Sequence, residues 1–253
     1  MIFLFATLVL LFSLTPTASA QRYVTFGSGL GLLMLDNQEL NRFRESYGQV
    51  NAADLYQTFR GFDGPAGLRW EIGLRSIAEH SMALTIASQG WQSQDQAEFN
   101  NGDRRNLLLK FSRITLEGEY GLGTGNHFIN ALVVFSLKRS ITMESSYSGG
   151  NPGKLEKSLS GTYKNTPDIA FDVGFSAGYI REPLLFILRL TLPVYSGGSD
   201  TFLLDRSKSA RLSEFSIFPA DYISYAAGIP YAGLRSTIDG FKITLMAMLV
   251  LPF

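Results

Sequence analysis

The feature of this sequence that most constrains its fold is a two-residue alternation of side-chain character. Between residues 168 and 179 every odd position is apolar, from Ile169 to Tyr179, and every even position is small or acidic. Successive side chains of a β-strand point to opposite faces, so a period of two is typical of a strand, whereas a helix repeats every 3.6 residues. The same alternation returns in seven further segments, at 23–35, 68–76, 81–91, 107–120, 126–143, 184–194 and 241–253. We therefore expect an all-β chain of eight strands.

Two of these segments carry a local prediction. In 107–120 the apolar residues stand at odd positions up to Phe111 and at even positions from Ile114. One inserted residue exchanges the two faces of a strand, so this slip predicts a β-bulge near residues 112–113. In 126–143 the odd positions, Ile141 and Met143 included, predict a continuous apolar outer face.

The connections between the expected strands alternate in length. In chain order they span about 36–66, 78–80, 97–105, 121–125, 144–167, 181–183 and 196–240. A soluble sandwich has no physical reason to place its long loops at every second connection. A transmembrane antiparallel up-and-down β-barrel does, because its short turns lie in the periplasm and its longer loops lie outside. We expect such a barrel, with both termini periplasmic and long extracellular loops at about 36–66, 144–167 and 196–240.

Composition agrees with a membrane barrel. Charged residues are only 17% of the chain, against about 25% in soluble domains. The 22 basic and 22 acidic residues cancel, which argues against a nucleic-acid partner, because phosphate binding needs a cationic surplus. The absence of cysteine excludes disulfides and thiolate catalysis. Alternate apolar side chains that face lipid explain why so many of them occur with so few charges.

The faces opposite the apolar ones predict a filled lumen. They hold glycine, serine, threonine and a few charges of both signs, including the acidic pair Glu117 and Glu119. Eight strands enclose a space that side chains fill, so charges there must be paired or hydrogen-bonded. The hypothesised lumen charge network is Arg69, Glu71, Arg75, Lys138, Asp168, Asp172, Arg189 and Lys242.

The two ends of the sequence carry export and assembly signals. Residues 2–14 are apolar and precede Ala18-Ser19-Ala20, which predicts a signal peptide at 1–20 and a single barrel domain at 21–253. The last strand is apolar at every second residue, through Leu249 and Leu251, to a final Phe253. This ending resembles the assembly signal of bacterial outer-membrane β-barrel proteins, and the chain is most similar to the small OmpA-barrel type. The resemblance implies the outer membrane of a Gram-negative bacterium, with lipid, lipopolysaccharide and the barrel-assembly machinery as partners, and an envelope protein as a further one.

No motif in the sequence predicts catalysis. The two histidines, His80 and His127, fall at short turns, and no histidine cluster has metal spacing, so we expect no catalytic residue, metal or cofactor. The expected function is that of a non-enzymatic barrel with a structural or surface-interaction role through its extracellular loops. In the first loop Leu40, Phe43 and Tyr47 predict a short amphipathic helix over the barrel mouth.

Several alternatives stay open at this point. The glycine face of the first strand and the charged lumen also suit a small pore or a transport or secretion accessory barrel. A lipid-modifying outer-membrane enzyme and a secreted β-sandwich are further alternatives. Residues 213–238 lie before Asp239-Gly240, a hairpin signal, and would give ten strands if they crossed the membrane.

Overall fold

The chain forms a closed antiparallel β-barrel. The computed structural model describes residues 20–35, 44–45, 47–49, 51–62, 66–149, 161–165, 170–196, 203–204 and 240–253. Eight of its strands form the ring, in the order β1 (Gln21–Leu35), β3 (Ala66–Ile77), β4 (His80–Phe99), β5 (Arg104–Thr124), β6 (His127–Ser148), β8 (Ala170–Arg181), β9 (Leu184–Ser196) and β11 (Gly240–Pro252). The last strand pairs back with the first, from Tyr23 opposite Pro252 to Leu35 opposite Gly240. The prediction of eight alternating strands is confirmed, and residues 213–238, which carried the ten-strand alternative, lie outside the described residues.

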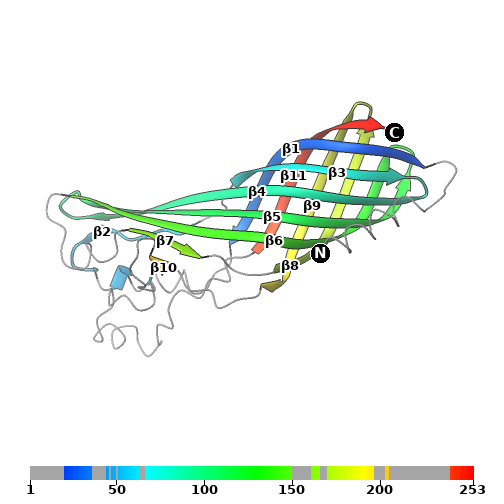
Figure 1. Ribbon diagram of the computed structural model, residues 1–253. Helices are drawn as coiled ribbons and strands as arrows, with labels where there is room; N and C mark the ends of the chain where they lie inside the picture. The colour runs from blue at the N-terminus through cyan, green and yellow to red at the C-terminus, as the bar shows by residue number, and fades with distance from the viewer. Residues whose placement is uncertain are drawn as a thin grey trace.

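The two ends of the barrel differ. Tight turns at 78–79, 125–126 and 182–183 gather at one end, which we call the short-turn end. At the other end β4, β5 and β6, with 20, 21 and 22 residues, continue well beyond the remaining strands (Figure 1). The predicted long connection at 97–105 is wrong, because these residues complete the β4–β5 hairpin around a turn at 100–103.

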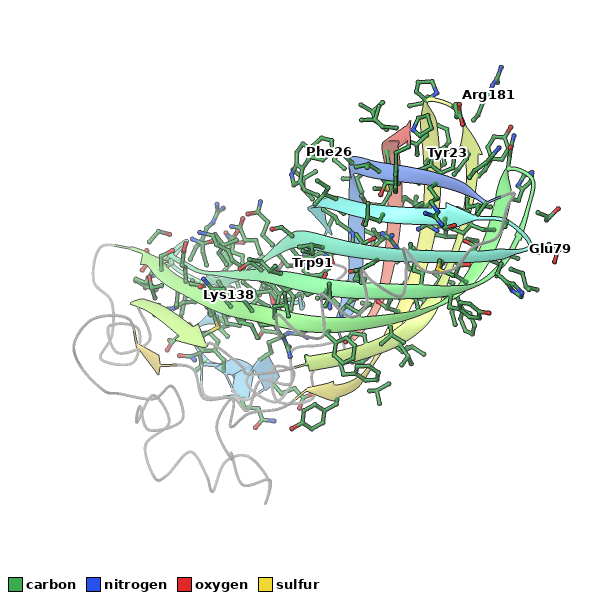
Figure 2. The ribbon with its side chains drawn as sticks, turned by 45° about the vertical axis from the view of Figure 1, so that its right-hand side comes forward. Tyr23, Phe26, Glu79, Trp91, Lys138 and Arg181 are labelled. Atoms are coloured by element: carbon green, nitrogen blue, oxygen red, sulfur yellow. The ribbon has the colours of Figure 1, made fainter. Side chains whose placement is uncertain are left out.

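The continuation of the three long strands is a small structure of its own, which we call the extension. It comprises residues 88–112 and 138–148, the described residues of the segment 44–62, which include β2 (Leu55–Gln57), and the short strands β7 (Gly161–Asn165) and β10 (Leu203–Leu204). Figure 2 labels Glu79 and Arg181 near the short-turn end and Trp91 and Lys138 toward the extension. No helix of the described part is long and apolar enough to span a membrane.

The outer wall of the barrel is apolar. Large apolar side chains stand exposed on all eight strands, among them Phe26, Leu30, Trp70, Ile72, Ile86, Ile114, Leu122, Ile129, Phe135, Phe175, Leu188 and Leu245. On β5 the outward positions from Ile114 to Leu122 are eight residues apart, about 27 Å at ~3.4 Å per residue. A strand tilt of about 40° reduces this to roughly 20 Å, near the ~25 Å apolar band of outer-membrane barrels. The architecture is therefore that of an outer-membrane β-barrel.

The predicted bulge in β5 is wrong, because no residue is inserted there. The odd-numbered side chains of β5 stay buried from Arg105 to Glu119, through both the extension and the barrel. What changes is the surroundings: in the barrel the apolar residues face outward to lipid, and in the extension they face inward to a protein core. The apolar residues therefore exchange faces although the strand does not.

The bulge lies on the neighbouring strand, β6. Ile114 pairs with Lys138 and Thr115 pairs with Ser136, so Leu137 is the extra residue. Beyond it the inward parity of β6 switches from even to odd residues. Ile141 and Met143, which we expected on the outer face, are consequently fully buried.

The space beside the glycines of β1 is occupied. A Cβ atom at Gly29 would lie 2.0 Å from the backbone oxygen of Leu245 and 2.6 Å from Sδ of Met246. At Gly27 it would lie 2.5 Å from Cγ of Met248. The glycines thus admit the methionines of β11 and leave no open path along this side of the lumen, which is the feature that the pore alternative required.

Candidate functional sites

The lumen holds a network of buried ion pairs. Its most connected member is Glu119 on β5, whose side chain is completely buried. One carboxylate oxygen accepts from Arg75 at 2.7 Å, Ser176 at 2.8 Å and Asn130 at 3.1 Å. The other accepts from Nε and Nη2 of Arg189, at 3.0 and 2.8 Å. This carboxylate alone links strands β3, β5, β6, β8 and β9 across the lumen.

Arg189 extends the network toward the extension. Its guanidinium also donates to both oxygens of Glu71, with Nη2 at 2.9 Å from Oε1. Glu71 in turn accepts from Arg69, whose Nη2 donates to Glu117 at 2.7 Å. Each of these charges therefore has at least one partner of opposite sign, as burial in a low-dielectric space requires.

A second group lies nearer the extension. Asp172 on β8 accepts from Arg113 at 2.6 Å and from Lys242 at 2.8 Å. Nε and Nη2 of Arg113 also donate to Oε1 of Gln89, each at 3.3 Å, and its guanidinium lies 5.3 Å from the Trp91 ring centre. Amide, carboxylate and aromatic groups thus surround this arginine.

The structure places most of the predicted lumen residues together. Arg69, Glu71, Arg75, Asp172, Arg189 and Lys242 are all buried inside the barrel. Lys138 is not, because the bulge at Leu137 turns its side chain to the exposed outer face. Asp168 lies outside the described residues.

Sequence reasoning missed Arg113 and Gln89, whereas Asn130 and Ser176 were placed on the inward faces without being assigned to the charge network. Arg113 was missed because we placed a bulge beside it, which left its face undefined. Arg113 is at an odd position of the same strand as Glu117 and Glu119, and this shared alternation could have predicted that its side chain points inward.

The histidines lie at the short-turn end on the outer wall. The His80 ring stacks on Tyr120 with centroids 6.0 Å apart, and the His127 ring lies 4.7 Å from that of Tyr179. Rings of this kind form the aromatic girdle of membrane barrels. Within the described ranges no group of three or more acidic or histidine side chains could hold a metal ion.

The last strand presents the proposed assembly signal on the outer wall. Leu249, Leu251 and Phe253 are all exposed, and the backbone N–H of Phe253 donates to the Arg22 carbonyl at 3.1 Å. The final aromatic side chain is therefore held at the short-turn end of the seam between β1 and β11.

The extension has its own apolar core. Its inward side chains are fully or nearly buried, and they include Tyr47, Phe59, Phe62, Ala97, Phe99, Leu107, Leu109, Phe111, Ile141 and Met143. Tyr47, part of the predicted amphipathic helix, lies in a helical stretch at 47–49 with its ring 4.9 Å from Phe59. Leu40 and Phe43 of that prediction lie outside the described residues. The segment 44–62 thus folds onto the three long strands.

A polar cleft of ≈ 740 Å³ opens between this segment and β4. It is lined by Gln57, Arg60, Gly61, Ser93, Gln94, Asp95, Gln96, Glu98 and Arg104. β3 pairs with β4 up to Gln92, and β2 pairs with it at Glu98. Among the described strands none pairs with that side of β4 in between. The cleft is therefore an opening in the sheet.

The two carboxylates of the cleft are held differently. Asp95 is nearly buried and accepts the backbone N–H groups of Arg60 at 3.0 Å and Gly61 at 2.8 Å. Glu98 is partly exposed and accepts from Nη2 of Arg104 at 3.3 Å. Asp95 is thus committed to fixing the far wall of the cleft, while Glu98 is accessible for proton transfer.

Comparisons with known proteins do not assign the chain to a family. No protein-family model and no curated protein matches it. Among solved structures it is similar to the outer membrane protease OmpT from Escherichia coli, with 9% sequence identity over 92% of this chain and 96% of that chain, and a TM-score of 0.42. With so low a sequence identity and TM-score, no functional residue and no activity of that protein can be assigned to this chain.

The match nevertheless corrects the expected function. We expected a non-enzymatic barrel with a structural or surface-interaction role, because the histidines lie at the short turns. A protein named as a protease is built on an outer-membrane barrel that aligns over most of this chain. This match to a protein named as a protease contradicts the expectation of a non-enzymatic barrel, which was wrong.

Proposed function

We propose that this chain is an outer-membrane enzyme, a hydrolase whose site is the polar cleft of the extension. The observation that carries the proposal is the cleft itself. It brings an accessible carboxylate, a fixed carboxylate and two arginines together, beyond the apolar band and open to water. The lumen, by contrast, commits its charges to one another and offers no such opening in the described part.

The cleft residues divide the chemistry among them. Glu98 is the proton-transfer group that activates a water molecule, and Arg104 holds its carboxylate in place. Arg60, whose Nη2 donates to Gln57 Oε1 at 2.7 Å, faces the cleft as a donor for an oxygen atom of the substrate. Asp95 is a positioning residue, because it fixes the backbone of Arg60 and Gly61.

The proposed setting follows the membrane architecture. We infer that residues 1–20 direct export and are removed, that the short-turn end and both termini lie in the periplasm, and that the extension lies outside the cell. The cleft would then meet lipopolysaccharide sugars, external polymers or another envelope protein. Assembly by the barrel machinery would read Leu249, Leu251 and Phe253.

The test is turnover by purified protein folded in detergent micelles. The panel contains a fluorogenic peptide library, phospholipids with lipid A, and surface oligosaccharides. We expect hydrolysis of one class and a loss of at least ~100-fold with Glu98→Gln, the usual cost of removing an acid–base group. The control is Glu144→Gln, since Glu144 is also a partly exposed carboxylate of the extension but pairs with Lys110 outside the cleft. No turnover of any class, or equal turnover by the wild type and the Glu98 variant, would overturn the proposal.

A further inference from the structure

The short-turn end holds a hydrogen-bonded group that the proposed hydrolase does not use. It is centred on Tyr23, the third residue of β1, whose side chain is 1% exposed (Figure 2). The Tyr23 hydroxyl contacts Oε1 of Gln21 at 2.8 Å and Oε1 of Glu182 at 2.9 Å, and it can donate to either. Glu182 belongs to the turn between β8 and β9. The hydroxyl therefore links the start of β1 to a turn on the far side of β11.

Gln21 becomes the first residue of the chain when residues 1–20 are removed, as inferred above. It is the first residue of β1, it is exposed, and it pairs with Ile77 of β3. The next residue is also fixed, because the backbone N–H of Phe253 donates to the carbonyl of Arg22 at 3.1 Å. The new α-amine thus stands at an ordered strand end, in the residue whose side-chain oxygen contacts Tyr23.

An N-terminal glutamine carries a nucleophile and an electrophile in one residue. Its neutral α-amine can attack the Cδ carbon of its own side-chain amide to close a five-membered lactam. The bond between the α-nitrogen and Cδ forms, the bond between Cδ and Nε2 breaks, and Nε2 leaves as ammonia. The step needs no oxidant and no further reactant. Negative charge develops on Oε1 in the tetrahedral intermediate, and Oε1 is the atom that the Tyr23 hydroxyl contacts.

Tyr23 and Glu182 can assist this step. The hydroxyl has one proton for the two oxygens, and its donation shifts to Gln21 as charge develops there, because hydrogen bonds to a charged acceptor are stronger. Glu182 is then free to accept the proton that the amine loses and to deliver it to the departing ammonia. Burial holds the Tyr23 ring in place before the reaction begins.

We propose that Gln21 cyclises to an N-terminal pyroglutamate after export, with Tyr23 as the donor to its side-chain oxygen and Glu182 as the proton acceptor. The product has no terminal charge and offers no free amine to an aminopeptidase. Its lactam oxygen is the former Oε1, so it keeps the contact with Tyr23 at the seam of the barrel. The proposal rests on the inferred cleavage after Ala20 and is independent of the cleft and of any activity there.

The first test is the intact mass of the wild type purified from outer membranes. We expect the mass of residues 21–253 less one ammonia, and tandem mass spectrometry should place the loss on Gln21. An unmodified Gln21, or a chain that starts at another residue, would overturn the proposal.

The second test measures the rate of cyclisation. An N-terminal fusion is removed from the folded protein in micelles to expose Gln21, and the loss of ammonia is followed by mass. We expect the folded wild type to react at least ~10-fold faster than the same chain in guanidinium chloride, a modest share of what a positioned oxyanion donor contributes. Tyr23→Phe keeps the ring and should lose this advantage, and Glu182→Gln should lose part of it.

The matched control is Tyr179→Phe, since Tyr179 lies on the outer wall beside His127 and should leave the rate unchanged. All variants are first checked for the folded gel mobility of an unheated barrel. Equal rates for the folded and unfolded wild type, or for the wild type and Tyr23→Phe, would show that the fold gives no assistance and would overturn the proposal.

Discussion

Replacing Glu119 by glutamine tests the lumen network at its most connected point. The variant keeps the shape of the side chain but removes the charge and turns an amide N–H₂ toward donors. In this variant Arg189 keeps its ion pair with Glu71. Among the described residues, Arg75 forms an ion pair only with Glu119, at 2.7 Å, and its guanidinium lies 4.1 Å from the Phe128 ring centre. Breaking a buried pair costs about 3–5 kcal/mol, and the stranded Arg75 places this case near 4 kcal/mol.

The assay is urea unfolding in micelles, with Glu144→Gln as the control. Glu144 pairs with Lys110 at 2.6 Å, but both side chains are about two-fifths exposed (40% and 44%), so that variant should lose no more than about 1 kcal/mol. Adding Arg75→Met to Glu119→Gln should recover part of the loss, because the unpaired cation is gone. If Glu119→Gln lost no more stability than the control, the lumen would be hydrated, which would contradict a lumen packed with buried ion pairs.

Three further predictions follow from the same structure. Gly67→Ala should destabilise the barrel by about 1–3 kcal/mol in the same urea assay, because its Cβ would meet the Gly90 carbonyl oxygen at 1.6 Å, while Gly118→Ala should cost less than half as much. The wild type in planar bilayers should give no large, stable ion current, since methionines and ion pairs fill the lumen; a steady open-channel current would restore the pore alternative. Deletion of Phe253 should lower the amount of folded barrel in cell envelopes but leave refolding into micelles unchanged, and a loss in both would assign Phe253 to stability instead of assembly.

Much of the barrel could be predicted from the sequence because lipid imposes a simple rule. Along each strand one face meets hydrocarbon, so the alternation from Phe171 to Tyr179 or from Ile243 to Leu251 is visible without any knowledge of the partner strand. The same rule predicted that Arg69, Glu71 and Arg189 share the interior. Their pairing could not be predicted, since it depends on register across strands.

The extension could not be predicted because its inward face is the apolar one, whereas in the barrel the outward face is apolar. Leu107, Leu109 and Phe111 point inward from β5 into the protein core of the extension, whereas Leu116 points outward to lipid. If the apolar residues of the whole strand are assumed to face lipid, this exchange of faces is misinterpreted as a β-bulge. The cleft was missed as well, because residues 57–61 and 93–98 are brought together only by the folding of the segment onto β4.

We infer that β5 leaves the bilayer between Ser112 and Ile114 and that its inward and outward faces stay the same on both sides of this boundary. The chain has no cysteine, so single cysteines can be placed at the even positions of β5 from 106 to 122 and reacted with a membrane-impermeant maleimide in lipid vesicles. We predict rapid labelling at 106, 108, 110 and 112, and protection from 114 through 120. Uniform labelling of the whole series, or protection that already begins at 106, would contradict the membrane boundary and with it the proposed extension.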